Sequence, residues 1–193
     1  MEFKISRTRT NLINAFAGES QARNRYTFFA SEAKKAGYEQ ISAVYTDTAE
    51  NEKEHAKLFY KLLVELAPGD VLQVTASFPT VLGDTLKNLG ASIAGEHEEW
   101  TSDYIEAAMI AQEEGFPKVA ATFRQIAEAE KSHERRFAAL KANIENGSVF
   151  RKGAKTQWRC RNCGRVVEGE EAPKSCPTCQ HPQGFFEVLA ENY

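Results

Sequence analysis

The apolar positions between residues 119 and 144 recur at alternating steps of four and three, which is the spacing of one face of an α-helix. The positions on this face are Val119, Phe123, Ile126, Glu130, His133, Phe137, Leu140 and Ile144. Subtracting 78 from each number gives a second face of the same kind, formed by Ile41, Tyr45, Thr48, Glu52, His55, Phe59, Leu62 and Leu66. A Glu-x-x-His pair therefore stands in the middle of each face that the pattern predicts to be buried.

The repeat continues upstream of these two faces. Gly18-Glu19 recurs as Gly95-Glu96 with an offset of 77, and Gly37 recurs as Gly115 with an offset of 78. The pattern predicts two helical hairpins, with glycine turns at 37 and 115 and helices over about 8–36, 39–66, 82–114 and 117–144. Residues 67–81 join the hairpins and are long enough to cross the end of a bundle. The predicted fold is an all-α four-helix bundle.

The change of offset from 77 to 78 indicates one inserted residue. Tyr26 and Tyr104 match at 78, so the insertion lies between Glu96 and Tyr104. A single inserted residue within a helix predicts a π-bulge, a feature often found at functional sites. Glu99 lies at this point, and its counterpart in the first half is Ala22.

The four helices are predicted to deliver one glutamate each to one level of the bundle. Glu19 and Glu52 lie 18 and 15 residues from the turn at Gly37, and Glu96 and Glu130 lie 19 and 15 residues from Gly115. This is the ligand set of a carboxylate-bridged two-metal site in a ferritin-like bundle. We expect Glu52 and Glu130 to bridge two metals ~3.5–4 Å apart. The complete set of expected ligands is Glu19, Glu52, His55, Glu96, Glu99, Glu130 and His133.

Other interpretations of these residues stay open. The buried glutamates and histidines could form salt bridges with Arg23 and Arg124 instead of binding metal. Glu99 could be only a hydrogen-bond acceptor beside a ligand. Tyr26 and Tyr104 could donate hydrogen bonds to the carboxylates or could simply pack in the core. His97 is expected to be solvated.

Composition narrows the class of protein. The 193 residues are 42% hydrophobic and 26% charged, and the net charge of −3 gives no support to nucleic-acid binding. The polar start and the lack of a long apolar run lead us to expect a cytoplasmic protein that does not bind membranes. Residues 1–146 carry a net charge of −5 and residues 147–193, the tail, carry +2. We place the domain boundary there and expect a mobile connector over 145–157.

The tail contains all four cysteines, in two Cys-x-x-Cys pairs. Cys160 and Cys163 form the first pair, and Cys176 and Cys179 form the second after twelve intervening residues. Four thiolates at this spacing predict a tetrahedral metal site within a small β domain, with zinc or iron as the metal. Disulfide formation is the alternative interpretation.

The residues as a whole resemble the rubrerythrin family. The motifs that carry the resemblance are "AGES" and "RNRY" in the first helix, "GEHEEWT" in the third, and "CPTCQHPQGFFE" in the tail. The resemblance implies a non-haem di-iron peroxidase that reduces hydrogen peroxide to water and protects against oxidative stress. It implies two iron ions in the bundle and one rubredoxin-type iron in the tail, with zinc as a possible substitute.

The same resemblance implies partners and residue roles. Electrons would come from an external donor, rubredoxin or an NAD(P)H-dependent reductase, and would cross between the chains of a homodimer. Glu99 and His55 would alternate as ligands of one iron, and Tyr26 and Tyr104 would act with them in catalysis. Two other functions fit parts of the pattern: a ferritin-like ferroxidase or iron-handling protein, and a zinc-ribbon binding module on a helical scaffold.

Overall fold

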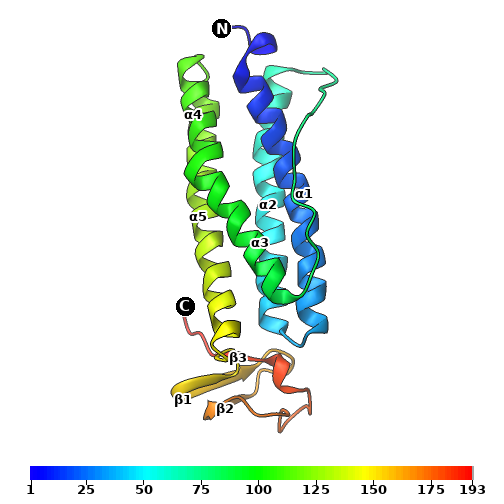
Figure 1. Cartoon of the computed structure of the whole chain (residues 1–193), viewed down its shortest axis with the longest axis vertical. Coiled ribbons are helices and arrows are strands. Elements are labelled where there is room, and N and C mark those ends of the chain that lie inside the picture. The colour runs from blue at the N-terminus through cyan, green and yellow to red at the C-terminus, as the bar shows by residue number, and fades with distance from the viewer. Residues whose placement is uncertain (193) are drawn as a thin grey trace.

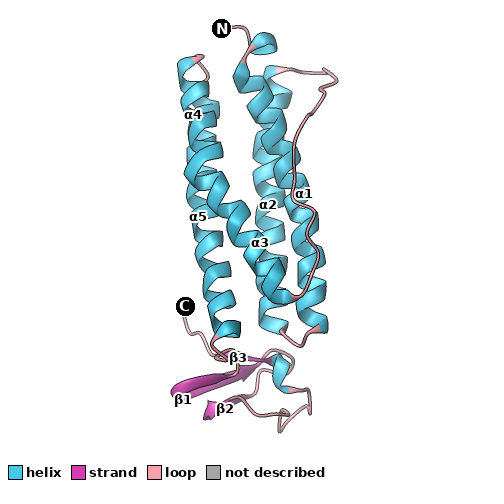
Figure 2. Cartoon of the chain, viewed as in Figure 1, coloured by secondary structure: helices cyan, strands magenta, loops and turns pink. Residues whose placement is uncertain are grey.

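The computed structural model describes residues 1–192 and contains a four-helix bundle above a small β domain (Figures 1 and 2). The bundle consists of three continuous pieces and one composite rod. The helical segments are α1 (Arg7–Lys35), α2 (Glu39–Leu66), α3 (Thr85–Glu98), the turn η2 (Glu99–Asp103), α4 (Tyr104–Glu113) and α5 (Pro117–Glu145). The predicted helices are confirmed to within three residues at each end, and so is the predicted fold class.

Tight glycine turns close the two hairpins. Gly37 and Gly115 have φ angles of +80° and +89°, in the left-handed region that glycine adopts without steric cost. Residues 67–84, which we call the strap, join the hairpins without regular secondary structure. The strap runs along the side of the bundle beside α1 instead of crossing its end (Figure 1). This path returns the chain to the end of the bundle where α3 begins.

The composite third rod contains the predicted irregularity. Residues Glu99–Asp103 form a π-helical turn between α3 and α4. The inserted residue is therefore accommodated where the change of offset predicts it, which confirms the π-bulge. The turn brings Tyr104 back to a buried position at the start of α4.

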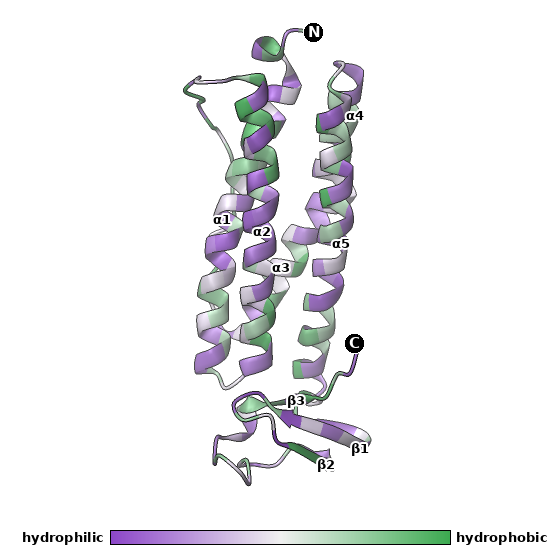
Figure 3. Ribbon diagram, turned by 180° about the vertical axis from the view of Figure 1, so that it is seen from behind, coloured by the Kyte–Doolittle hydropathy of each residue, from purple (hydrophilic) through white to green (hydrophobic). Residues whose placement is uncertain are grey.

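Two aromatic clusters occupy the bundle core, one on each side of the glutamate level. Tyr26 and Tyr45 pack against Phe137 with ring centroids 5.4 and 5.0 Å away. Tyr104 and Phe123 pack against Phe59 with centroids 5.7 and 4.9 Å away. The members of these clusters correspond at an offset of 78, and in each cluster one ring, Phe137 or Phe59, comes from the hairpin that does not supply the other two. Hydrophilic positions are common on the outward faces of α5 and of the lower part of α2 (Figure 3), whereas Tyr60 and Val64 are exposed near the C-terminal end of α2.

A buried carboxylate at the bundle end that carries the Gly115 turn caps α1. Glu114, just before the Gly115 turn, accepts hydrogen bonds from the backbone N–H of Thr8 at 2.8 Å and from its hydroxyl at 2.6 Å. Ser6 caps the same helix by accepting from Arg9 N–H at 3.0 Å. These contacts satisfy backbone N–H groups that have no partner within the helix.

The tail forms a three-stranded antiparallel sheet with the order β2-β1-β3. Its strands are β1 (Arg151–Cys160), β2 (Val166–Glu171) and β3 (Phe186–Val188). The bounds expected for the connector, 145–157, are wrong, because residues 151–157 already belong to β1, where Arg151, Thr156 and Gln157 pair with β2. Trp158, Ala172 and Phe186 form the small core of this domain together with two of the cysteines.

The tail packs against the bundle end that carries the α1–α2 turn (Figure 1). Phe150 stacks on Tyr38 with ring centroids 6.1 Å apart and planes at 9°. Gly184 lies so close to Gly37 that an added Cβ would collide with the Gly37 carbonyl oxygen. The tail is therefore docked on the bundle of its own chain.

Candidate metal centres

Six of the seven predicted ligands of the bundle lie near the midpoints of its four rods, where the third rod is α3, η2 and α4 together. Glu19 comes from α1, Glu96 from α3, and the two Glu-x-x-His pairs come from α2 and α5. All six side chains are buried, with Glu130 completely inaccessible and His55 the most accessible at 9%. A surface charge cluster is therefore excluded.

The six side chains form two groups, each with its ligand atoms within 4.8 Å of one another. One group contains Glu19 and His55, the other contains Glu96 and His133, and both groups share Glu52 and Glu130. The two shared glutamates connect the groups into one continuous polar centre.

The shared glutamates present one oxygen to each group. Glu52 places Oε2 2.9 Å from His55 Nδ1 and Oε1 3.2 Å from His133 Nδ1. Glu130 places Oε1 2.9 Å from His55 Nδ1 and Oε2 2.8 Å from His133 Nδ1. This division of oxygens is the one that a carboxylate bridging two metals requires. That Glu52 and Glu130 bridge stays a prediction.

The polar atoms of this centre are close together but are poorly aligned for hydrogen bonds. Both carboxylate oxygens of Glu52 and Glu130, Oε2 of Glu96, and Nδ1 of both histidines are buried without a hydrogen-bond partner. Orphaned buried groups of this kind are costly unless something binds between them. A pair of cations coordinated by these atoms removes the cost, so the donor set fits a two-metal site.

The electrostatics of the centre also favour cations. Burial and the charges of Glu130 and Glu52 raise the pKa of Glu19 well above its usual range, and burial raises that of Glu96 to about 8. Burial opposes protonation of the histidines, but Glu130 and Glu52 raise the pKa of His55 to about 9 and that of His133 to about 12. Without metal the centre therefore retains protons, which metal binding must displace.

Two tyrosines hold the terminal glutamates in a reciprocal manner. Tyr104, on α4, donates a hydrogen bond to Glu19 of α1 at 2.6 Å, and Tyr26, on α1, donates to Glu96 of α3. Burial and the nearby carboxylates raise the pKa of both phenols well above its usual range, so both stay protonated donors. The alternative that these tyrosines serve only as core packing is excluded.

One residue of this centre was not predicted from the sequence. Asn51 Oδ1 lies 3.2 Å from His133 Nε2, which orients the imidazole with Nδ1 toward the carboxylates. The counterpart of Asn51 in the repeat is Ala129, so the repeat gave no signal for it. Within residues 1–192, Nε2 of His55 has no such hydrogen-bond partner.

Glu99 stands apart from both groups. It is half-buried in the π-helical turn, and its ligand atoms do not belong to either cluster. Burial, followed by the charges of Glu96 and Glu130, raises the pKa of Glu99 well above its usual range. The raised pKa means that the Glu99 carboxyl group holds its proton more strongly than an ordinary glutamate does. Metal ligation by Glu99 stays a prediction.

The interpretation that arginine side chains pair with the buried glutamates of the centre is wrong. Arg23 pairs with the exposed Glu50 at 3.9 Å, outside the centre. Among the residues that the structure describes, no arginine or lysine forms a salt bridge with the six clustered side chains. His97 is exposed and lies 3.2 Å from Glu134, as expected for a solvated residue.

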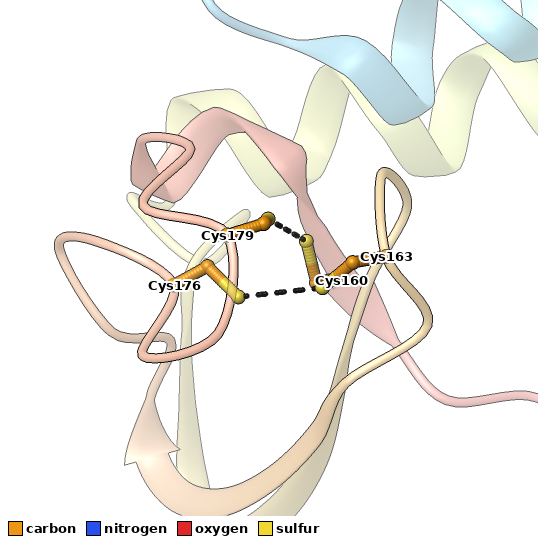
Figure 4. Close-up of side chains that lie close together, drawn as sticks. All are labelled: Cys160, Cys163, Cys176 and Cys179. Carbon is orange, nitrogen blue, oxygen red and sulfur yellow. Dashed lines mark hydrogen bonds between the residues drawn. The ribbon is translucent and has the colours of Figure 1, made fainter.

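The four cysteines of the tail converge from two loops (Figure 4). All four are free thiols, so the disulfide interpretation is wrong. Cys160 and Cys179 sulfurs lie 3.7 Å apart, and Cys163 and Cys176 sulfurs lie 3.6 Å apart. The backbone N–H of His181 lowers the pKa of Cys179 to about 6. The arrangement is a four-thiolate site for one metal ion.

The fold and the two sites define a class of protein. A four-helix bundle with a buried carboxylate–imidazole centre, joined to a small four-cysteine domain, defines a two-metal carboxylate protein of the ferritin-like fold. Residues 10–141 match the family model "Rubrerythrin", and residues 158–187 match "Rubrerythrin, rubredoxin-like domain". The chain belongs to the rubrerythrin family.

Known relatives cover almost the whole chain. A rubrerythrin of Porphyromonas gingivalis is 56% identical over 98% of this chain and 94% of its own length. A rubrerythrin of Nitratidesulfovibrio vulgaris is 50% identical over 98% of both chains. A solved structure of nigerythrin in its mixed-valence state is 30% identical, with a TM-score of 0.65 over 98% of this chain and 94% of that chain. In residues 1–192, no helix has the length and apolar character needed to cross a membrane.

Proposed function

We propose that this chain is a peroxidase that reduces hydrogen peroxide to water with electrons delivered through the tail. The observation that supports this most is the pair of buried ligand groups sharing Glu52 and Glu130, on the same chain as four converging thiols. An iron store needs the first site but does not need an attached one-electron carrier. Membership of the rubrerythrin family is consistent with an oxidoreductase.

The proposed division of work follows from the contacts. A ferrous pair held by the six clustered side chains would supply the two electrons that cleave the O–O bond. Tyr104 and Tyr26 fix the orientation of Glu19 and Glu96 through their hydrogen bonds. Glu99 is half-buried beside the centre and its pKa is raised by burial, so we propose that it delivers protons to the departing oxygen atoms.

His55 and His133 differ in a way that supports different roles. Asn51 holds His133 in place, whereas His55 has no comparable anchor among the described residues and is slightly more accessible. We therefore propose that His55 is the imidazole that exchanges with Glu99 when the charge of its iron changes. Carboxylate oxygens favour the ferric ion, and imidazole is acceptable to the ferrous ion.

Electron delivery is proposed to use a partner chain. The tail docks at the Gly37 turn, and Glu52 lies fifteen residues further along α2, so ~20 Å of helix separates the two levels. A head-to-tail homodimer would bring the thiolate iron of one chain to the bundle centre of the other. The external donor would be rubredoxin or an NAD(P)H-dependent reductase, and we place the protein in the cytoplasm, where thiols stay reduced.

Anaerobic titration of the fully reduced, iron-loaded protein tests the proposed reaction. We expect rapid oxidation of the iron pair by about one equivalent of hydrogen peroxide, and slower oxidation by oxygen. Faster turnover with oxygen, with iron retained as a ferric product, would identify a ferroxidase instead. Colour separates the third function, because a ferric four-thiolate site absorbs visible light and a zinc ribbon does not.

Mixing two inactive variants tests the proposed cross-chain route. One variant lacks Cys160, and the other carries glutamine at both Glu52 and Glu130. Mixed dimers pair an intact tail with an intact bundle centre across chains, so reductase-driven activity should return. Absence of activity after confirmed subunit exchange would favour transfer within one chain.

A further inference from the structure

A cavity of about 930 Å³ lies between α1, the third rod and the strap. Its outer wall includes Phe78 and Pro79 of the strap, and its inner end is lined by Glu99 and Tyr104. Tyr104 donates its hydrogen bond directly to Glu19. The cavity therefore extends from the surface of the bundle to groups that touch the carboxylate centre.

Two glycines on facing helices line this cavity. Gly18 on α1 and Gly95 on α3 each precede a clustered glutamate by one position. Glycine within a helix is unfavourable relative to alanine, so its presence at both positions requires a reason. The usual reasons are a left-handed backbone or a close neighbour. Neither residue has a positive φ, and an added Cβ at either one would meet no atom within 4 Å.

The space beside these glycines is thus open, and side chains there would extend into it. The opposite case occurs in the same protein at Gly184, where an added Cβ collides with the backbone of Gly37. Gly18 and Gly95 are not needed for close packing. What they provide is free volume on two sides of one cavity.

We propose that the cavity is the passage by which a small peroxide reaches the carboxylate centre, and that Gly18 and Gly95 keep this passage open. The inference rests on the proposed peroxidase function. Hydrogen peroxide is small and uncharged, and it exchanges hydrogen bonds readily. The amides of Asn14 and Gln21 and the small side chains of Ala91 and Ala94 line the route, together with the guanidinium of Arg25, and can exchange hydrogen bonds with a neutral molecule or let it pass.

Ferrous ion is the competing occupant, because the carboxylates of Glu98, Asp103 and Glu106 also line the cavity. All three residues are exposed, so they lie at its solvent side. The two occupants differ in how often they must pass through the cavity. The metal enters once, when the centre is loaded, whereas the substrate enters in every turnover. Rates of metal loading and of peroxide reaction therefore distinguish them.

Leucine in place of Gly95 or Gly18 tests the passage. Stopped-flow mixing of the reduced, iron-loaded protein with hydrogen peroxide should give a second-order rate constant lowered about tenfold, because the path to the centre is narrowed. The larger cumene hydroperoxide should react more slowly than hydrogen peroxide in the wild type and should be slowed further by either leucine. Alanine at the same positions should have a smaller effect in the same direction.

Gly90→Leu is the matched control. Gly90 lies on the same helix as Gly95 but does not line the cavity, and an added Cβ there meets only Lys141 Cε at 3.9 Å. Its peroxide rate should stay within about twofold of the wild type. A readout independent of activity is the thermal unfolding midpoint of the metal-free protein, which Gly95→Ala should raise because the new methyl meets no obstacle.

The outcomes separate the two proposals. If the wild type does not react with peroxide, the proposed function fails. If the wild type reacts and the leucine variants react equally fast, the passage is elsewhere and this inference fails. Slower ferrous loading with unchanged peroxide kinetics would also overturn it and would identify the cavity as a metal route. A lower unfolding midpoint in Gly95→Ala would show that the space beside Gly95 is closed.

Discussion

Removing the hydroxyl of Tyr104 tests how strongly the bundle organises its metal ligands. Tyr104→Phe deletes the 2.6 Å hydrogen bond to Glu19 and leaves the ring packed against Phe59 and Phe123. A hydrogen bond to a charged group contributes about 1.5–3 kcal/mol. If that energy serves to hold Glu19 for metal, the affinity of the centre should fall roughly 10- to 100-fold, as is typical for partners of metal ligands.

The measurement is an anaerobic competition between the metal-free protein and a chelator of known affinity for cobalt or ferrous ion. Tyr45→Phe is the control, because Tyr45 is also buried and its hydroxyl pairs with Ser92 Oγ at 3.2 Å instead of with a glutamate. The control should lose about 0.5–1.5 kcal/mol of unfolding free energy and should bind metal normally. Equal metal affinity in the two variants would refute the role assigned to Tyr104.

Three other perturbations test separate parts of the molecule. Glu114→Gln should cost about 1–2 kcal/mol at pH 7. Burial raises the pKa of Glu114, but the hydrogen bonds from Thr8 outweigh burial and lower it. The carboxylate therefore stabilises the fold above the pKa of the unfolded chain, and this stabilisation is lost as pH falls through the lower pKa of the folded protein. Urea unfolding of both proteins should show the difference shrinking toward acid pH, and a constant difference would contradict this. Cys160→Ser should abolish reductase-driven turnover, yet the chemically reduced variant should still consume about one peroxide per iron pair. Loss of that single turnover in a folded variant would mean that the tail does more than carry electrons. Gly184→Ala places a methyl group against the Gly37 carbonyl, so the tail should leave its dock and the radius of gyration in X-ray scattering should rise. An unchanged radius would refute the docked arrangement.

The features that follow the internal repeat could be predicted from the sequence. Helix limits depend on local periodicity and glycine turns, which are short-range signals. The π-helical turn at Glu99 could also be predicted, because the offset between the two halves of the repeat changes by one residue at that point in the sequence. The convergence of the two Glu-x-x-His pairs followed from equal distances to Gly37 and Gly115.

The features that break the repeat could not be found in this way. Asn51 and Glu114 correspond to Ala129 and Ala36, so nothing in the other half pointed to them. The strap has no periodicity, and no local signal indicates that it runs beside α1, which is distant in sequence. Docking of the tail depends on the approach of Gly184 to Gly37, a contact across most of the chain that no local pattern encodes.

The reciprocal tyrosines have a consequence for how the centre assembles. Tyr26 of the first hairpin holds Glu96 of the second, and Tyr104 of the second holds Glu19 of the first. Neither hairpin alone can orient its own terminal glutamate, so the complete metal centre forms only when the two hairpins have packed together. The arrangement is that of an isologous interface, in which each hairpin supplies a tyrosine donor to the other and presents a glutamate acceptor to it. Two identical copies of one such hairpin, related by a twofold axis, would already satisfy both contacts, and the single chain contains that symmetry in covalently linked form.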